Sequence, residues 1–251
     1  MVETRNRKHK FGLVGRNISY SFSKKYFAEK FAAQALVEHT YENFDLPNIE
    51  AFPELLKSNP DLQGLNITIP YKEAVLPYLD VLDPMAKAIG AVNTVHFTKD
   101  GLVGHNTDAF GFRESLLPQL RPHHKKSLIL GTGGASKAIA HVLRELGITV
   151  TYVSRNPTTG QLAYSDLDAQ VLGAHTLIIN CSPVGTYPNI TDCPQLPYES
   201  LNKDHLLYDL IYNPERTAFL KQGEAVGASV QNGLQMLVLQ AERAWEIWNT
   251  K

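Results

Sequence analysis

The stretch SLILGTGGA, residues 127–135, decides how the second half of this chain folds. The segment SLIL has the composition of a buried strand, and the glycine-rich turn after it leads into a helical pattern over residues 136–146. Glycines at such a turn let the backbone approach a pyrophosphate, which the N–H groups of the helix N-terminus can bind. The third position of the G-x-G-x-x-G pattern is Ser136, so an ordinary tight turn is the alternative.

The next predicted strand, residues 148–153, ends at the corner Ser154-Arg155-Asn156. A site that prefers NAD carries an acidic residue at this corner, where it binds the ribose 2′-hydroxyl. Here no carboxylate occurs between Glu145 and Asp166, and an arginine can pair with a 2′-phosphate instead. The corner therefore favours NADP, with a solvated surface arginine as the alternative.

Strands and helices alternate on both sides of this unit. Further strands are predicted at residues 11–15, 40–44, 65–69, 91–97, 176–180 and 206–210. Further helices are predicted at residues 24–34, 49–56, 73–78, 85–90 and 233–248. The alternation favours a mainly parallel sheet in the first half, followed by a hairpin turn at residues 99–101. Two α/β units with a boundary near residue 105 fit this order better than one.

Short polar residues gather at the ends of the predicted strands in the first half. They lie in the segments NITIPYK (66–72), GAVNT (90–94) and GHNTD (104–108), and at Ser21 and Ser23. Caps and solvated lysines explain such residues one at a time. Their gathering at strand ends indicates a ligand site, because ligands of open α/β sheets bind at that edge.

Composition excludes several classes of protein. With 251 residues, 43% of them apolar, the chain is long enough for one large or two small cores. Lys and Arg (24) balance Asp and Glu (25), which argues against binding nucleic acid or a membrane by bulk charge. No apolar window is long enough to span a bilayer, and no metal-ligand spacing occurs among the nine histidines. The polar N-terminus and the two cysteines favour a cytoplasmic protein with free thiols.

From about residue 11 to residue 245 the chain resembles the shikimate dehydrogenase family. The resemblance is carried by motifs in fixed order: Ser21-Phe22-Ser23, NITIPYK, GAVNT, GHNTD, GTGGA, SR, NCSPVG (180–185), YDLIYNP (208–214) and GLQMLVLQ (233–240).

The resemblance implies a soluble α/β enzyme that reversibly reduces 3-dehydroshikimate to shikimate with NADPH. It implies a substrate domain over residues 10–105, on which the C-terminal helix 234–251 packs, and a Rossmann-like NADP domain over residues 106–233. It assigns catalysis to Lys72 and Asp108. Substrate contacts fall to Ser21, Ser23, Thr68, Lys72, Asn93, Asp108, Tyr212 and Gln240, and cofactor contacts to Gly131, Thr132, Gly133, Gly134, Ala135, Ser154, Arg155, Asn156, Leu210 and Gly233. The partners expected are small molecules, with the chain acting as a monomer or a homodimer.

Two other functions stay open. One is a quinate/shikimate dehydrogenase that uses NAD, which the Ser21 and Ser23 pair and the missing acid after Val153 disfavour. The other is a ligand sensor without catalysis, which has no need of both Lys72 and Asp108.

Overall fold

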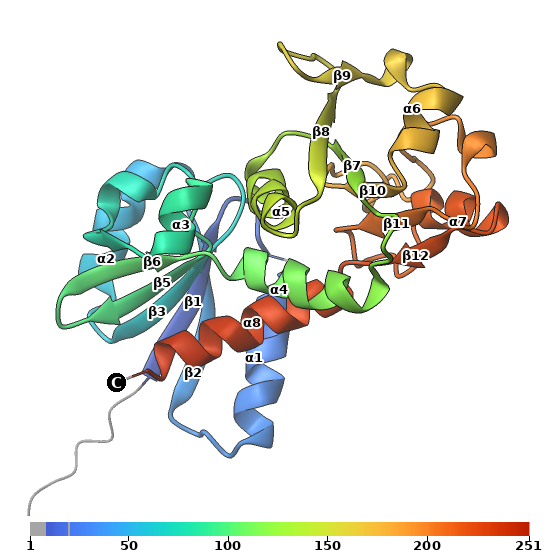
Figure 1. Ribbon diagram of the computed structural model, residues 1–251. Helices are drawn as coiled ribbons and strands as arrows, with labels where there is room; N and C mark the ends of the chain where they lie inside the picture. The colour runs from blue at the N-terminus through green and yellow to red at the C-terminus, as the bar shows by residue number, and fades with distance from the viewer. Residues whose placement is uncertain (1–8, 20, 251) are drawn as a thin grey trace, which may run out of the picture. The chain divides into compact units, whose positions relative to one another are not determined.

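The computed structural model describes residues 9–19 and 21–250, which fold as two compact units (Figure 1). The first unit holds the described residues up to Thr107 together with those from Ala241 onward. The second unit runs from Asp108 to Gln240.

The first unit is built on a six-stranded mixed sheet with the order β2-β1-β3-β5-β6-β4. Its strands are β1 (His9–Gly15), β2 (His39–Asp45), β3 (Leu62–Ile67), β4 (Val81–Leu82), β5 (Thr94–Thr98) and β6 (Gly101–His105). Its helices are α1 (Phe22–Ala33), α2 (Phe52–Ser58) and α3 (Pro84–Ile89). The last turns of α8 (Leu234–Trp248) also belong to this unit.

Hydrophobic layers cover both faces of this sheet, because side chains alternate along each strand. From β1, Phe11 packs with Phe27 of α1 and Trp248 of α8. Val14 points to the opposite face, where it joins the cluster that contains Phe52 of α2. The C-terminal end of α8 therefore completes one of the two layers of the first unit.

The second unit has a six-stranded sheet with the order β12-β11-β10-β7-β8-β9, in which all neighbouring strands pair in parallel. Its strands are β7 (Lys126–Leu130), β8 (Thr149–Ser154), β9 (Leu162–Ala163), β10 (Leu177–Asn180), β11 (Leu206–Asp209) and β12 (Ser229–Gln231). Its helices are α4 (Thr107–Leu116), α5 (Gly134–Glu145), α6 (Ala169–Ala174) and α7 (Ala218–Ala225), with most of α8. This is the strand order of the Rossmann fold. The strands that follow β7 are added on one side of it up to β9 and on the other side from β10 onward, and such sheets bind ligands at this reversal of the strand order, between β7 and β10.

The sheet of the first half is mainly parallel, as predicted, since three of its five strand pairs are parallel. The exception is β5, which pairs antiparallel with both β3 and β6. The predicted hairpin turn makes β5 and β6 antiparallel to each other. One expectation for the first half is wrong. Residues 73–78 do not form an α-helix but turns and a short 3₁₀ helix at Leu76–Tyr78, since Pro77 lacks an N–H donor and restricts the residue before it.

Within the described ranges, no helix is long and apolar enough to cross a membrane. Both cysteines, Cys181 and Cys193, are free.

Candidate functional site

The turn after β3 carries two of the predicted site residues, Thr68 and Lys72. The Thr68 N–H donates to the Val14 carbonyl at 2.8 Å, and the Tyr71 N–H donates to the Thr68 carbonyl at 2.9 Å. The Lys72 carbonyl accepts from the Val92 N–H at 2.8 Å. These bonds hold the backbone of the turn between β1 and the segment that leads into β5.

A buried hydrogen-bond network runs from β2 to the start of α4. The Tyr41 hydroxyl donates to Asn66 Oδ1 at 2.8 Å, and Asn66 Nδ2 donates to the Asn93 carbonyl at 3.3 Å and to Thr94 Oγ1 at 3.2 Å. Asn93 Nδ2 donates to Thr107 Oγ1 at 3.0 Å, and Asn93 Oδ1 accepts from the Thr107 N–H at 2.6 Å. Because both ends of its amide are engaged, Asn93 has one orientation.

Ser23 belongs to the same network. It lies buried in the first turn of α1, two residues after the N-cap Ser21, and its side chain hydrogen-bonds Tyr41. Burial raises the pKa of Tyr41 well above its ordinary value, so this phenol stays a neutral donor. The network thus connects two predicted substrate residues, Ser23 and Asn93.

The residues that connect them were not predicted as site residues. Asn66 could have been predicted as a site residue, since it shares a strand face with Thr68. Tyr41 gave none, because a tyrosine inside a predicted strand is indistinguishable from a core residue. Helix α4 begins at Thr107, so Asp108 lies in its first turn, where the residue is buried.

In the second unit, the glycine turn lies at the carboxyl end of β7. Gly131 has φ = 107°, a conformation that favours glycine, and its N–H donates to the Val153 carbonyl at 2.9 Å. A Cβ on Gly131 would lie 3.3 Å from the Cys181 carbonyl carbon and the Ser182 nitrogen, so the turn packs on the backbone that follows β10.

The turn leads directly into α5. Gly133 is the N-cap of α5, and the Ser136 hydroxyl donates to the Gly133 carbonyl at 2.6 Å. A Cβ on Gly133 would meet no heavy atom of the described chain within 4 Å. Thr132 and Gly133 are exposed, with Gly134 and Ala135 partly so. A helix N-terminus behind an open glycine turn at the reversal point of the sheet fits a pyrophosphate.

The corner after β8 holds Ser154, Arg155 and Asn156. Ser154 Oγ accepts from the Asn156 N–H at 3.2 Å, and the Arg155 side chain is exposed. The next carboxylate along the chain, Asp166, accepts from the Ala163 N–H at 2.7 Å. The first acid after this corner is therefore engaged with the backbone of β9.

The remaining predicted residues lie after β11 and along α8. Gly233 packs so closely on Leu210 that a Cβ on Gly233 would clash with the Leu210 carbonyl. Tyr212 lies two residues after Leu210 and is half-buried. Gln240, also in the second unit, is buried in α8, and its Nε2 donates to the Leu237 carbonyl at 2.8 Å.

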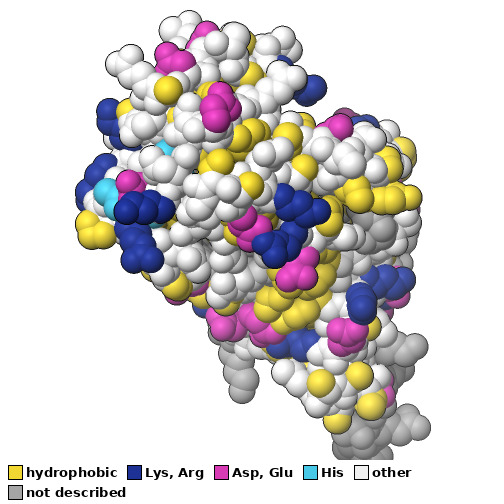
Figure 2. All heavy atoms as spheres, turned by 90° about the vertical axis from the view of Figure 1, so that its right-hand side faces the viewer, with side chains coloured by type: hydrophobic (Ala, Val, Ile, Leu, Met, Phe, Trp, Pro, Cys, Tyr) yellow, Lys and Arg dark blue, Asp and Glu magenta, His cyan; other side chains and the backbone are white. Residues whose placement is uncertain are grey.

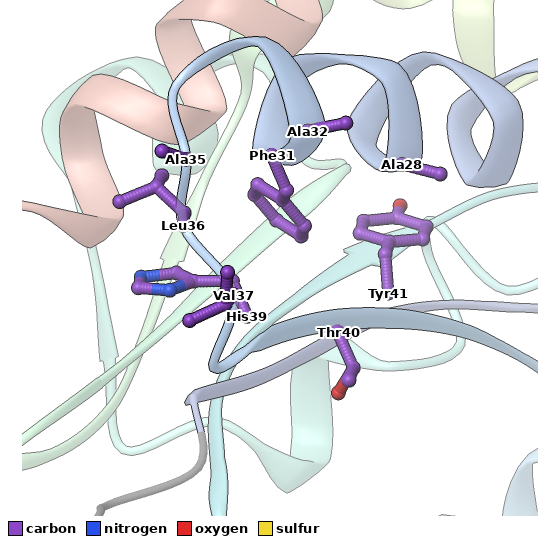
Figure 3. Close-up of a pocket in the computed structure, with 9 residues that line it drawn as sticks. All are labelled: Ala28, Phe31, Ala32, Ala35, Leu36, Val37, His39, Thr40 and Tyr41. Carbon is purple, nitrogen blue, oxygen red and sulfur yellow. The ribbon is translucent and has the colours of Figure 1, made fainter.

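A hollow of about 390 Å³ lies elsewhere, between α1 and β2 of the first unit (Figure 3). Its walls include Phe31, Leu36, Val37 and His39, and none of the predicted site residues lines it. Burial lowers the pKa of His39, which leaves this lining without a charged group at neutral pH.

Charge is mixed over the face drawn in Figure 2, where Lys and Arg side chains lie among Asp and Glu. The described residues contain no group of three His, Cys, Asp or Glu side chains that could hold a metal ion.

The model of the shikimate dehydrogenase substrate binding domain matches residues 13–95. The shikimate dehydrogenase (NADP(+)) of Clostridium botulinum strain Hall is 36% identical over 248 residues, which cover 94% of this chain and 95% of that relative. The enzyme of the same name from Methanococcus vannielii is 35% identical, with 94% and 90% covered. Among solved structures, the shikimate 5-dehydrogenase of Thermus thermophilus in complex with NADP(H) and shikimate is 36% identical, with a TM-score of 0.83 over 96% of this chain and 93% of that one.

Proposed function

The chain belongs to the shikimate dehydrogenase family, and we propose that it catalyses the reversible reduction of 3-dehydroshikimate to shikimate with NADPH, a step towards chorismate and the aromatic amino acids. One observation carries this proposal: a glycine turn open to solvent stands at the reversal point of a Rossmann sheet, in a chain that also has Lys72 and Asp108 in the family's motifs.

The first unit is proposed as the substrate domain. Shikimate has one carboxylate and three hydroxyls, which call for neutral donors and acceptors held in fixed orientations. Ser21, Ser23, Thr68 and Asn93 supply such groups, and the network through Tyr41 and Asn66 supports them. Tyr212 and Gln240 are proposed as substrate residues on their place in the family's motifs.

Lys72 and Asp108 are proposed as the catalytic pair. When bound, NADP(H) supplies or accepts the hydride. The Lys72 ammonium gives a proton to the alkoxide that forms on the substrate, and takes it back in the oxidation direction. The Asp108 carboxylate, buried at the start of α4, accepts a hydrogen bond from a substrate hydroxyl.

The second unit is proposed as the NADP domain. Of residues Gly131 to Ala135, Gly131 would shape the turn, and the N–H groups of the following residues at the start of α5 would hold the pyrophosphate. Ser154, Arg155 and Asn156 would hold the adenosine 2′-phosphate, and the backbone of Leu210 and Gly233 would face the rest of the cofactor. The bond from the Ala163 N–H to Asp166 supports NADP over NAD, because it ties this carboxylate to the backbone, whereas the exposed Arg155 can pair with a 2′-phosphate.

Replacing Arg155 by alanine tests the cofactor assignment. The expected result is a loss of about 10- to 100-fold in kcat/KM for NADP, because a bidentate charge-assisted pair with the 2′-phosphate is removed. The value for NAD, which lacks that phosphate, should change little. Arg216→Ala is a matched control, since Arg216 is also exposed in the second unit and pairs with Glu224. Equal losses with both cofactors would contradict the assignment.

The proposed activity itself is tested by assaying the oxidation of shikimate and of quinate, each with NADP and with NAD. The expected result is that shikimate with NADP gives the highest kcat/KM. Activity with quinate and NAD alone would identify a quinate/shikimate dehydrogenase instead. Binding of shikimate without turnover under all four conditions would identify a ligand sensor.

A cytoplasmic location and a monomeric or homodimeric state are also proposed. The free thiols Cys181 and Cys193 support a reducing compartment. Fractionation of cells that express the protein, and light scattering of the purified enzyme, test the two points.

A further inference from the structure

Asp209 is a buried carboxylate at the carboxyl end of β11, where it lies opposite Asn180 of β10. Its side chain accepts three hydrogen bonds. Asn180 Nδ2 donates to Oδ1 at 3.0 Å, the Ile211 N–H donates to Oδ1 at 3.1 Å, and the Thr217 hydroxyl donates to Oδ2 at 2.7 Å. The proposed catalytic chemistry does not use this group, so its position requires another reason.

The bond to Asn180 continues into the segment that follows β10. With Nδ2 turned towards Asp209, Asn180 Oδ1 accepts from the Ser182 N–H at 3.0 Å and from the Ser182 hydroxyl at 2.6 Å. Asn180 Nδ2 also reaches the Val184 carbonyl at 3.3 Å. This is the same backbone on which the glycine turn packs at Gly131. The Asp209 carboxylate therefore sets the orientation of the Asn180 amide. That amide in turn holds the backbone after β10, which lies against the glycine turn of the proposed cofactor site.

The bond from the Ile211 N–H connects Asp209 to a second part of the proposed cofactor site, at Leu210 and Gly233. The Ile211 carbonyl accepts from the Gly233 N–H at 3.1 Å, and Gly233 packs directly on Leu210. Both Leu210 and Gly233 are proposed cofactor residues. The third partner, Thr217, is the N-cap of α7, where its hydroxyl oxygen accepts from the Leu220 N–H at 3.3 Å.

We propose that Asp209 is a positioning residue of the NADP(H) site: its ionised carboxylate holds the Ser182–Val184 segment and the Leu210–Ile211 backbone in the arrangement that binds the cofactor, and neutralising it weakens that hold. The inference rests on the proposed function, because it takes these segments as cofactor-binding. Hydrogen bonds to an ionised acceptor are roughly twice as strong as those to a neutral one, so the charge matters as well as the shape.

The charge of Asp209 can change within the working pH range. Burial raises its pKa to about 6, and the bonds from Thr217, Ile211 and Asn180 act in the opposite direction. The titratable groups that face it are Cys181, at the end of β10, and Tyr198, and both are neutral because burial raises their pKa. Thr217 faces it from α7 and carries no charge.

The effects of acid on stability and on binding have opposite signs. Since the pKa of Asp209 in the fold lies above its ordinary value of 3.8, the folded state takes up the proton more readily than the unfolded chain. The contribution of this group to stability therefore rises as the pH falls through about 6. Cofactor affinity should fall over the same interval.

The Asp209→Asn variant tests the proposal, since it keeps the shape of the side chain and removes the charge. The Kd of NADPH, measured by fluorescence titration, should rise about tenfold at pH 7.5. The wild-type affinity should decline more steeply below about pH 6 than that of the variant, in which the protonation of the cofactor's 2′-phosphate remains and that of residue 209 does not. The thermal midpoint of the unliganded variant should match or exceed that of the wild type. Asp168→Asn is the matched control, because Asp168 caps α6 in the same unit and is exposed.

The Thr217→Val variant keeps the proposal testable if Asp209→Asn does not fold. Removing the hydroxyl that donates to Oδ2 should move the acidic decline of NADPH affinity to higher pH. An unchanged Kd and an unchanged pH profile in either folded variant would overturn the proposal. NADPH binding without shikimate oxidation by the wild type would instead overturn the proposed function and leave this test intact.

Discussion

Replacing Lys72 by alanine is expected to lower kcat for shikimate oxidation by about 10²- to 10⁴-fold, the range that one general acid–base group contributes. The backbone bond from the Val92 N–H to the Lys72 carbonyl does not need the side chain, so the turn after β3 should keep its structure. The neutral donors of the first unit remain as well. The KM for shikimate should therefore change only a few fold, as steady-state kinetics with saturating NADP would show.

The control is Lys87→Ala, which removes an exposed lysine from the last turn of α3 in the same unit. This variant should retain wild-type kcat. A Lys72→Ala enzyme with an unchanged kcat would remove Lys72 from the catalytic pair, and a rise in KM alone would make it a binding residue.

Replacing Trp248 by alanine is expected to destabilise the protein by about 3–5 kcal/mol, as other buried Trp→Ala substitutions do. The Trp248 ring stacks on Phe11 with their centroids 4.9 Å apart, and its Nε1 donates to the Val95 carbonyl at 3.0 Å. It also covers the backbone at Gly64, where a Cβ would clash with the indole. The substitution would leave a cavity and remove the donor from a buried carbonyl. Urea unfolding followed by far-UV circular dichroism measures the loss.

Trp245→Ala is the matched comparison, since Trp245 lies on the same helix and is only half-buried. Trp245→Ala should lower the free energy of unfolding clearly less than Trp248→Ala does. Equal losses at the two positions would contradict the view that the end of α8 is held in the first unit chiefly through Trp248.

Strands β7, β8, β10 and β11 of the second unit could be predicted from local runs of residues, whereas the short strands β9 and β12 were not predicted. The run SLIL and the glycines after it specify a buried strand and a turn to a helix, and both are confirmed as β7 and α5. Helix α7 was not predicted, although Thr217 caps it, because its 8 residues are too few to show a clear helical pattern.

The sheet of the first unit shows what local patterns cannot specify. An alternation of strands and helices predicts parallel pairing only where each crossover contains a helix. Between β5 and β6 the connection is a hairpin turn, which makes these two strands antiparallel, and β5 is also antiparallel to β3. The 3₁₀ turn at Leu76–Tyr78 replaced a predicted helix for a reason that was visible in the sequence, namely Pro77.

The candidate site was predictable in its motifs but not in its supports. Motif order led to Ser23, Asn93 and the glycine turn. The residues that support them come from other strands. Tyr41 hydrogen-bonds Ser23, and Asp209 bonds Asn180, which precedes the backbone on which the glycine turn packs. Pairing between strands is a property of the fold. Asp209 stood in a quoted motif, YDLIYNP, yet nothing in that motif showed that its carboxylate would be buried against Asn180 and Thr217.

The proposed reaction moves a hydride between shikimate and NADP. The most direct measurement uses shikimate deuterated at the carbon whose hydroxyl is oxidised, incubated with the enzyme and NADP, with both products analysed by NMR. We expect one deuterium in each reduced cofactor for each 3-dehydroshikimate formed. Reduced cofactor without deuterium, or no reduction of NADP at all, would contradict it.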